Sequence, residues 1–356
     1  MGGGPAGAAA ALRLAREGSG AGAAPLLLER SRETGDALCG GFLSWRTLDA
    51  LAAIGVEADA LGGEAIGRVR LFAGTRRVEA DLPAPAMAVS RRRLDTVLLA
   101  AAARAGAAVE RGVAVRAIEP GRVRTADGAI IEAAALFLAS GKHDVRGLAR
   151  AAPHDDPAIG LRIRLLPTPA LRRVLAGVIE LHLVRGGYAG IACQEDGSAN
   201  ICLAVRRSRL HEAGTPAALL ARLGAELPPL GDRLAEARGS EPVEAIANVP
   251  YGWRARAGEA GLFRLGDQAG VIPSLAGEGM GIALASAAGA VAAYRRGGAE
   301  AATGWQPRFA RRLARPLAVA GWLRSLAESG AAPLFPPIAA PLLPLLARAT
   351  RVSQPG

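Results

Sequence analysis

The chain has 356 residues, 51% of them hydrophobic and 21% charged, so extended disorder is excluded and there is room for two domains or one large composite fold. A net charge of +11 usually indicates a nucleic-acid or membrane partner. Lys142 is the only lysine, however, and the few aromatic residues are not interleaved with a basic run. We interpret the charge as the arginine bias of a GC-rich genome and expect no nucleic-acid partner.

The sequence has no pattern typical of a metal site, a disulfide framework or a membrane span. Cys39, Cys193 and Cys202 form no Cys-x-x-Cys pair and no cluster with histidine. The first residues lack the basic and apolar regions of a signal peptide, and no stretch of about 18 apolar residues is free of charge and proline. We therefore expect a cytoplasmic protein, with contact to the inner face of a membrane left open by its apolar tail.

The opening segment MGGGPAG has the spacing of a dinucleotide-binding loop, because Gly2, Gly4 and Gly7 satisfy the pattern G-x-G-x-x-G. Glycine is so abundant in this chain that the pattern alone could occur by chance. Helix-forming residues follow the pattern at 8–17, however, as the dinucleotide-binding loop requires. Small residues at Ala6 and Gly7 let that helix begin close to a pyrophosphate. The free N–H groups of the helix N-terminus then attract the negative charge of the phosphates.

A short strand is predicted at 26–28, where three leucines precede Glu29. An acid at the end of the second strand, about 20 residues beyond the loop, hydrogen-bonds the ribose of an adenosine group. Glu29 stands slightly further away than that, which an extra turn at 18–22 explains. The alternative is that Glu29 is only a surface acid at a strand end.

No apolar strand precedes the first glycine in the printed sequence. In this type of fold that strand lies in the middle of the parallel sheet, and without it two neighbouring strands lose their hydrogen-bond partners. We therefore expect that Met1 is a misassigned start and that the natural chain begins upstream.

A second glycine-rich turn stands far downstream. Apolar residues at 262–265 predict a strand that runs into Gly266 and Asp267, and a turn at 277–280 leads into a predicted helix from about 280 to 295. An aspartate at a strand end can accept a hydrogen bond from a sugar-chain hydroxyl. A glycine turn at a helix N-terminus can bring bare N–H groups against an electron-rich ring edge.

Together, the segments GGGPAG…LLLER and RLGDQAG…P…GEGM resemble the flavoprotein superfamily of aromatic hydroxylases (FAD-binding monooxygenases) and geranylgeranyl reductases, over nearly the whole chain. The resemblance implies an α/β fold in which a Rossmann-like FAD-binding domain carries an inserted antiparallel β-sheet substrate domain and a C-terminal helical tail. The expected bounds are 1–60, 88–150 and 255–300 for the FAD-binding domain, 61–87 and 151–254 for the substrate domain, and 301–356 for the tail.

The resemblance also implies which residues hold FAD. The opening motif would hold the ADP half, the Gly-Asp motif the ribityl chain and pyrophosphate, and the next helix start would face the isoalloxazine ring. Carried over, these roles fall on Gly2, Gly4, Pro5, Ala6, Gly7, Glu29 and Arg30, on Gly266 and Asp267, and on Gly277, Gly279 and Met280.

Three middle segments agree with the resemblance. SRRRLD at 90–95 resembles the family's R-x-x-L-D helix, with Arg91 along the flavin, although Arg92 or Arg93 could take that role. Val115 is the expected backbone contact to the adenine. Where the family has a D-G or G-x-x-S-x-x-R motif, Gly141 and Arg146 fit, but Lys142 and His143 replace the acid and the serine, which puts the nicotinamide step in doubt.

The segment Cys39-Gly40-Gly41 resembles the C-G-G loop of the geranylgeranyl reductase branch, which lies near the flavin on the substrate side. We count all three among the expected cofactor contacts. Packing remains the alternative interpretation of the thiol, because catalysis would need a lowered pKa.

Residues 157–250 alternate apolar and polar side chains, as in a β-sheet, and Asp196-Gly197 predicts a hairpin. Gly186 and Gly187 indicate a bulge or a close approach. His182 and Tyr188 could face a substrate, but no partner acid or base is identifiable for either, and we expect His154 and His211 to lie on the surface.

The tail begins with a basic amphipathic helix that is kinked or restarted at Pro316, and continues with apolar residues broken by prolines at 332–352. Such a segment can lie on a membrane surface, cap an apolar pocket, or pack against the FAD domain.

The favoured hypothesis is an FAD-dependent oxidoreductase with NAD(P)H as transient reductant, most simply a monooxygenase that hydroxylates a small apolar aromatic or polyketide-like substrate. A flavin-dependent alkene reductase of the geranylgeranyl type is the alternative. A truncated flavoprotein without catalysis, or a membrane-surface binding protein, is the alternative of another class. No catalytic residue is identified from the sequence.

Overall fold

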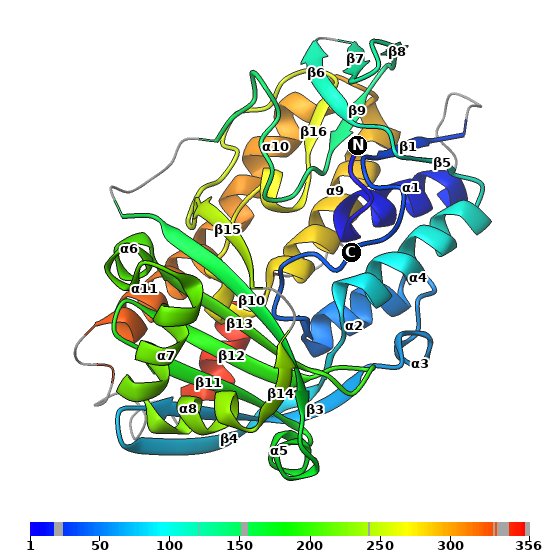
Figure 1. Cartoon of the computed structure of the whole chain (residues 1–356). Helices are drawn as coiled ribbons and strands as arrows, with labels where there is room; N and C mark the ends of the chain where they lie inside the picture. The colour runs from blue at the N-terminus through cyan, green and yellow to red at the C-terminus, as the bar shows by residue number, and fades with distance from the viewer. Residues whose placement is uncertain are drawn as a thin grey trace.

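The computed structural model describes residues 1–17, 24–119, 121–150, 156–240, 243–329, 332 and 342–352, with the backbone alone at 237–240. Figure 1 shows two halves. The helical half is built on α1, α4 and α9, and the sheet half on a nine-stranded sheet. The predicted mixed α/β fold is therefore confirmed.

The helical half centres on α1 (Pro5–Glu17), which packs against α9 (Gly279–Gly297) and α4 (Arg91–Arg104). All residues from Pro5 to Leu12 are buried. Most of them are alanine or glycine, so the helices can approach closely. The other elements of this half are β1 (Leu26–Glu29), α2 (Trp45–Ala52), α3 (Ala58–Leu61), β5 (Ala108–Arg111), β6 (Val115–Glu119), β7 (Arg122–Thr125), β8 (Ile130–Glu132), β9 (Leu136–Leu138) and β16 (Leu262–Arg264).

Two short parallel pairs, β1–β5 and β9–β16, flank the first two residues of the chain. Gly2 N donates to Leu28 O at 2.8 Å, while Met1 N donates to Phe137 O and Ala139 N donates to Met1 O, both at 2.9 Å. Residues 1 and 2 therefore lie between β1 and β9 and hydrogen-bond to both. The expectation that the natural chain begins upstream stays a prediction.

The sheet half contains β2 (Phe42–Leu43), β3 (Glu64–Ala73), β4 (Arg76–Ala88), β10 (Ala158–Pro167), β11 (Val178–Val184), β12 (Gly187–Cys193), β13 (Ala199–Arg206), β14 (Ala237–Ser240) and β15 (Glu244–Val249). All neighbours are antiparallel except β3 and β11. The expectation of a wholly antiparallel sheet is therefore wrong at this pair. Parallel neighbours need a crossover connection, and here the chain between them passes through the helical half at 91–150.

Two glycine signals in the sheet are confirmed. β12 and β13 form a hairpin whose turn contains Gly197 at φ +75°, as Asp196-Gly197 predicts. A Cβ on Gly187 would lie 2.4 Å from Ala204 O, so this position requires the close approach that only glycine allows.

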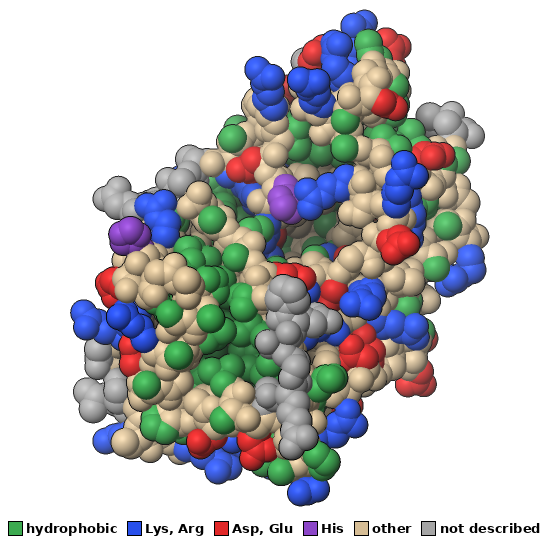
Figure 2. Space-filling model, in the orientation of Figure 1, with side chains coloured by type: hydrophobic (Ala, Val, Ile, Leu, Met, Phe, Trp, Pro, Cys, Tyr) green, Lys and Arg blue, Asp and Glu red, His purple; other side chains and the backbone are tan. Residues whose placement is uncertain are grey.

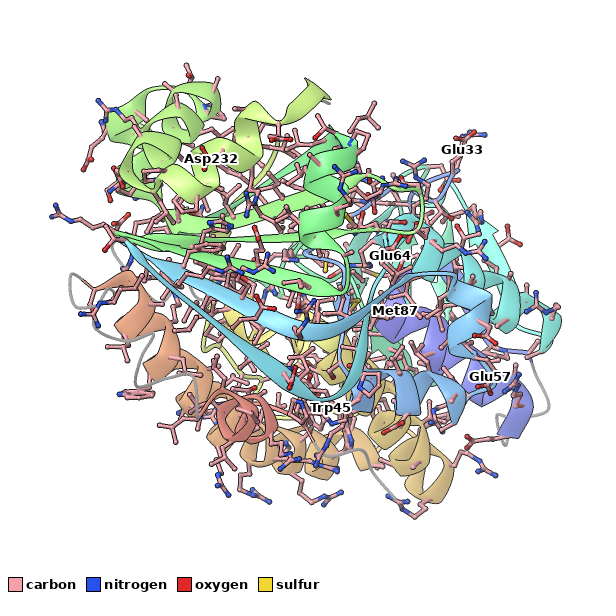
Figure 3. The ribbon with its side chains drawn as sticks, turned by 90° about the horizontal axis from the view of Figure 1, so that it is seen from below. Glu33, Trp45, Glu57, Glu64, Met87 and Asp232 are labelled. Carbon is pink, nitrogen blue, oxygen red and sulfur yellow. The ribbon has the colours of Figure 1, made fainter. Side chains whose placement is uncertain are left out.

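Helices cover both faces of the large sheet. One face carries α5 (Pro169–Leu175), α6 (Arg207–Ala213), α7 (Pro216–Glu226) and α8 (Pro228–Ala235), and the other carries the tail. In Figure 3, Asp232 of α8 and Trp45 of α2 lie on opposite sides of the sheet.

The tail forms α10 (Ala301–Arg312), α11 (Ala314–Glu328) and α13 (Leu343–Ala349). The predicted restart is present at Leu313, which leaves Pro316 in the first turn of α11, where proline is tolerated. α11 contacts β11 and β12, and α13 contacts β4. No helix among the described residues is long and apolar enough to cross a membrane. Within the described part of the tail, α11 and α13 thus cover the sheet, whereas α10 packs on α9 and β16 in the helical half. Contact with a membrane surface stays a prediction.

His182 points away from the tail, so the prediction that it faces a substrate is wrong. On β11, alternate side chains face opposite sides, and Glu180 and His182 are both fully buried under α5 and α8. Glu180 accepts hydrogen bonds from Arg70 Nη1 at 2.7 Å, Arg233 Nε at 3.0 Å and His182 Nε2 at 3.1 Å, and the His182 ring stacks on Phe72. The ring therefore has a structural role.

We predict that Glu180→Gln lowers the free energy of unfolding by about 3 kcal/mol or more, because it leaves Arg233 without its carboxylate and takes one of two carboxylates from the buried Arg70. Arg70 keeps its contact with Glu79 at 2.8 Å. Glu226→Gln is the matched control, since Glu226 is exposed where it meets Arg209, and a pair with an exposed member contributes about 1 kcal/mol or less. Urea denaturation of both variants measures the difference. Equal losses in the two variants would contradict the assignment.

Stability should also fall as the pH drops from 7 to 5. Burial lowers the pKa of His182, so the imidazole takes up a proton more readily in the unfolded chain than in the folded one. The stability that the neutral ring contributes above pH about 6.5 is therefore lost as the pH falls below that value. Burial alone would raise the pKa of Glu180, but its hydrogen bonds from His182, Arg233 and Arg70 bring it down to about 2, so its share is lost only below pH about 4.5. His182→Phe keeps the ring stack and should flatten the slope between pH 7 and 5. An unchanged slope would argue against His182 as its source.

Candidate functional site

A cavity of about 330 Å³ runs from the N-terminus of α1 in the helical half to the large sheet in the other half. Figure 2 shows the hollow between the halves, with hydrophobic side chains gathered over the part of the molecule that holds the sheet. Thirteen of the predicted cofactor residues line this cavity: Gly4, Pro5, Ala6, Cys39, Gly40, Gly41, Arg91, Gly141, Gly266, Asp267, Gly277, Gly279 and Met280.

The two outer glycines of the opening motif shape the loop rather than line the cavity. A Cβ on Gly7 would lie 1.9 Å from Gly2 O, and a Cβ on Gly2 would lie 2.3 Å from Ala139 O. The loop therefore crosses itself and passes β9 at distances that only glycine permits. This close packing exposes the N-terminus of α1 to the cavity through Gly4 and Pro5.

Three predicted contacts lie outside the cavity wall. Glu29 accepts from Gly3 N at 2.6 Å and from Ser31 N at 2.8 Å, so one carboxylate oxygen binds the opening motif and the other binds the turn after β1. Arg30 lies at the surface, 2.9 Å from His143 Nε2. Val115 begins β6 and does not line the cavity.

The Gly-Asp turn is fastened to the segment that follows β9. It forms a short 3₁₀ helix, η1 (Gly266–Gln268), in which Gln268 Nε2 donates to Gly141 O at 3.0 Å. The buried Arg150 joins the same two segments, since it donates to Asp267 O at 3.0 Å and to Lys142 O at 2.7 Å. Sequence analysis missed both side chains, because donation to a backbone carbonyl leaves no motif.

Two cationic side chains, Arg91 and Lys142, line the cavity. Arg91 makes a bidentate contact with Asp95 at 3.0 and 2.8 Å, and its Nη2 lies 3.1 Å from the place of a Cβ on Gly4. Burial alone would lower the pKa of Arg91, but the carboxylate of Asp95 more than offsets burial, so the pKa of Arg91 is raised. Burial likewise opposes the charge of Lys142, whose pKa Asp267 raises. The site therefore keeps two fixed positive charges.

The glycines of the cavity leave bare backbone facing open space. A Cβ on Gly40, Gly141 or Gly279 would meet no atom within 4 Å, although all three residues line the cavity. A flat ring needs such a cradle, and the helix N-terminus with Arg91 suits a pyrophosphate. The residues present therefore fit FAD.

The buried Glu278 joins the glycine turn to the end of the tail. It accepts from Arg351 Nη1 at 2.8 Å and from Val352 N at 3.1 Å, and the Arg351 guanidinium lies 5.1 Å from the centroid of the Trp45 ring. Arg351 itself lines the cavity. Sequence analysis missed this contact, because nothing near Arg351 distinguishes it from the other arginines of the tail.

The far part of the cavity is an apolar lobe between the sheet and the tail. Its walls include Val69, Leu71, Ile179, Leu181 and Leu183 from the sheet, and Leu323, Ala327, Leu343, Leu346 and Ala347 from the tail. Tyr188 lines the same lobe, and its contact with a substrate stays a prediction. His211 is exposed, as predicted, and His154 lies outside the described residues.

The cysteines differ in their access to the cavity. Cys39 and Cys202 line it, whereas Cys193 is buried on the other face of the sheet. Burial raises the pKa of Cys202 to about 12, so this thiol stays protonated and unreactive. Among the described residues, no group of three or more histidine, cysteine or acidic side chains is arranged to hold a metal ion.

Comparison with known proteins gives one family match and a set of solved structures with the same fold. Residues 1–145 match the family described as "FAD binding domain". No curated protein matches the sequence.

Solved structures with the same fold include PqsL, a probable FAD-dependent monooxygenase from Pseudomonas aeruginosa, at 17% identity and a TM-score of 0.69, covering 92% of this chain and 95% of that one. They also include the flavin-dependent halogenase CmlS, at 20% identity and a TM-score of 0.76. That match covers 99% of this chain and 67% of CmlS. A mutant form of 2-methyl-3-hydroxypyridine-5-carboxylic acid oxygenase matches at 19% identity and a TM-score of 0.69. That match covers 99% of this chain and 97% of the oxygenase chain. Residues 1–145 thus match the FAD binding domain family, and the chain as a whole has the mixed α/β fold of these solved structures.

Proposed function

We propose that this protein is an FAD-dependent monooxygenase that hydroxylates a small apolar aromatic or polyketide-like molecule, with NAD(P)H as its reductant. One observation carries the proposal: a single cavity joins the glycine-lined cradle to the apolar lobe. A ring in the cradle and a substrate in the lobe would therefore share one space, as direct transfer between them requires.

The residues of the helical half would hold FAD as follows. Pro5 and Gly4 at the start of α1, with the Arg91 guanidinium, would bind the pyrophosphate. Asp267 would accept a hydrogen bond from a sugar-chain hydroxyl. The bare backbone of Gly40 and Gly279 would lie against the ring. When bound, the flavin supplies exchange of hydride with a nicotinamide and reaction with oxygen.

The rest of the chain would exclude water from the cavity and would place the Lys142 ammonium in it. The sheet and the tail close the lobe with aliphatic side chains, which exclude water. Lys142 keeps its charge in the same cavity and would favour negative charge there.

A flavin-dependent alkene reductase is the second candidate, and the position of the C-G-G loop favours it. Cys39, Gly40 and Gly41 all line the cavity, as the resemblance to that branch implies. The two candidates differ in their use of oxygen, because only the monooxygenase consumes it with its substrate.

We predict that the visible absorption spectrum of the purified chain loaded with FAD shows flavin bands at about 370 and 450 nm. These bands should bleach when NADPH or NADH is added without oxygen. Readmission of oxygen with a panel of bicyclic aromatic compounds should give a product that contains one atom from ¹⁸O₂. Reduction of an alkene without oxygen uptake would instead favour the second candidate. A chain that binds no FAD would overturn both.

Gly279→Val should weaken FAD binding about tenfold to a hundredfold, because the new side chain would occupy the cradle and overpacking of this size costs about 1–3 kcal/mol. Gly321→Val in α11 is the matched control, since a Cβ there also meets no atom and the residue does not line the cavity. Quenching of flavin fluorescence measures both affinities. If Gly279→Val binds FAD as tightly as the control, the ring does not lie at this turn.

A further inference from the structure

Three hydroxyl groups meet in the wall of the apolar lobe, at the side nearest the glycine turn. Tyr188 belongs to β12, Tyr251 follows β15, and Ser274 begins the 3₁₀ helix η2 (Ser274–Ala276). Tyr188 Oη donates to Ser274 Oγ at 2.6 Å, and Tyr251 Oη lies 2.6 Å from the same oxygen. All three residues, here called the hydroxyl cluster, line the cavity.

The hydroxyl cluster has one more proton to donate than it uses. Three hydroxyls carry three protons, and two hydrogen bonds among them use two. The structure gives these side chains no other hydrogen-bond partner among the described residues. If Tyr251 donates to Ser274, the Ser274 O–H remains free, and if Ser274 donates to Tyr251, the Tyr251 O–H remains free. Because all three residues line the cavity, this O–H is available to a ligand there.

The surroundings favour a neutral donor facing an acceptor. Leu71, Leu183 and Val249 pack around the tyrosines, which are only 7% and 8% exposed. Burial raises the pKa of both phenols, so they stay protonated. The Arg324 guanidinium lies 4.8 Å from the centroid of the Tyr251 ring, and Lys142 faces the same cavity, so a cationic ligand is disfavoured.

The position of Ser274 connects the hydroxyl cluster to the predicted cofactor cradle. The Ser274 carbonyl accepts a hydrogen bond from Gly277 N at 2.9 Å. Gly277 stands two residues before Gly279, which belongs to the cradle. An oxygen atom held by the cluster would therefore lie beside the glycine turn, with the rest of the ligand in the apolar lobe.

We propose that the hydroxyl cluster binds the single acceptor oxygen of an otherwise apolar ring substrate, a carbonyl oxygen conjugated to the ring. This names the substrate class of the same cavity and so rests on the proposed function. The cluster is a specificity-determining site: a ring compound that lacks the carbonyl leaves the free O–H without a partner.

The test compares two probes that differ by one carbonyl group, 1-tetralone and tetralin, by calorimetric titration of the FAD-loaded chain, or of the chain as purified if no FAD binds. The triple variant Tyr188→Phe/Ser274→Ala/Tyr251→Phe removes only the three oxygen atoms. The affinity ratio of 1-tetralone to tetralin should fall about tenfold or more in this variant, because the bound carbonyl loses its donor. Tyr294→Phe, in a tyrosine that packs on Phe137 away from the cavity, should leave the ratio unchanged.

A second measurement needs no variant, in case the triple variant does not fold. The infrared carbonyl stretch of 1-tetralone bound to the unaltered chain should lie below its value in cyclohexane. A stretch at the cyclohexane value, an affinity ratio that the triple variant leaves unchanged, or failure of both probes to bind would each overturn the inference. None of these readouts depends on NAD(P)H or turnover, so they are separate from failure of the proposed function.

Discussion

The buried contact between Glu278 and Arg351 holds the cavity together. Glu278 precedes α9 in the glycine turn, and Arg351 follows α13 at the end of the described tail. Their 2.8 Å contact, with the Arg351 bond to Ala276 O at 2.8 Å, fixes the tail against the turn that forms the cradle. Without it, the wall of the apolar lobe would have no charged attachment to the helical half at this point.

This contact is costly, and the neighbouring residues are arranged to allow it. Burial raises the pKa of Glu278, which Arg351 opposes, and a buried pair of this kind contributes more to position than to net stability. A Cβ on Gly281 would lie 2.4 Å from Glu278 Oε1, so glycine is required there if the carboxylate is to turn toward the tail. The small residues of α9 thus serve the tail contact as well as the packing against α1.

The sequence predicts the parts of this site that depend on near neighbours. Gly7 is required for a local reason, because a Cβ there would meet Gly2 O, and the Gly-Asp turn follows directly from a short strand, so both could be recognised. Arg150 and Gln268 could not, because they donate to backbone carbonyls far along the chain. Glu29 shows the limit of a motif: its place at the end of the strand was predicted, but its contacts with the backbone of Gly3 and Ser31 were not, because no spacing indicates them.

The large sheet shows why alternation alone could not place the substrate wall. A period of two separates Glu180 and His182 from Leu181 and Leu183, but it does not say which set faces the cavity when helices cover both faces. The tail decides this, because α11 and α13 lie on the side of Leu181. Tyr188 then faces the cavity, and Tyr251 and Ser274 reach it from two other segments. A polar group in an apolar wall is therefore the product of three distant segments, and only the fold reveals it.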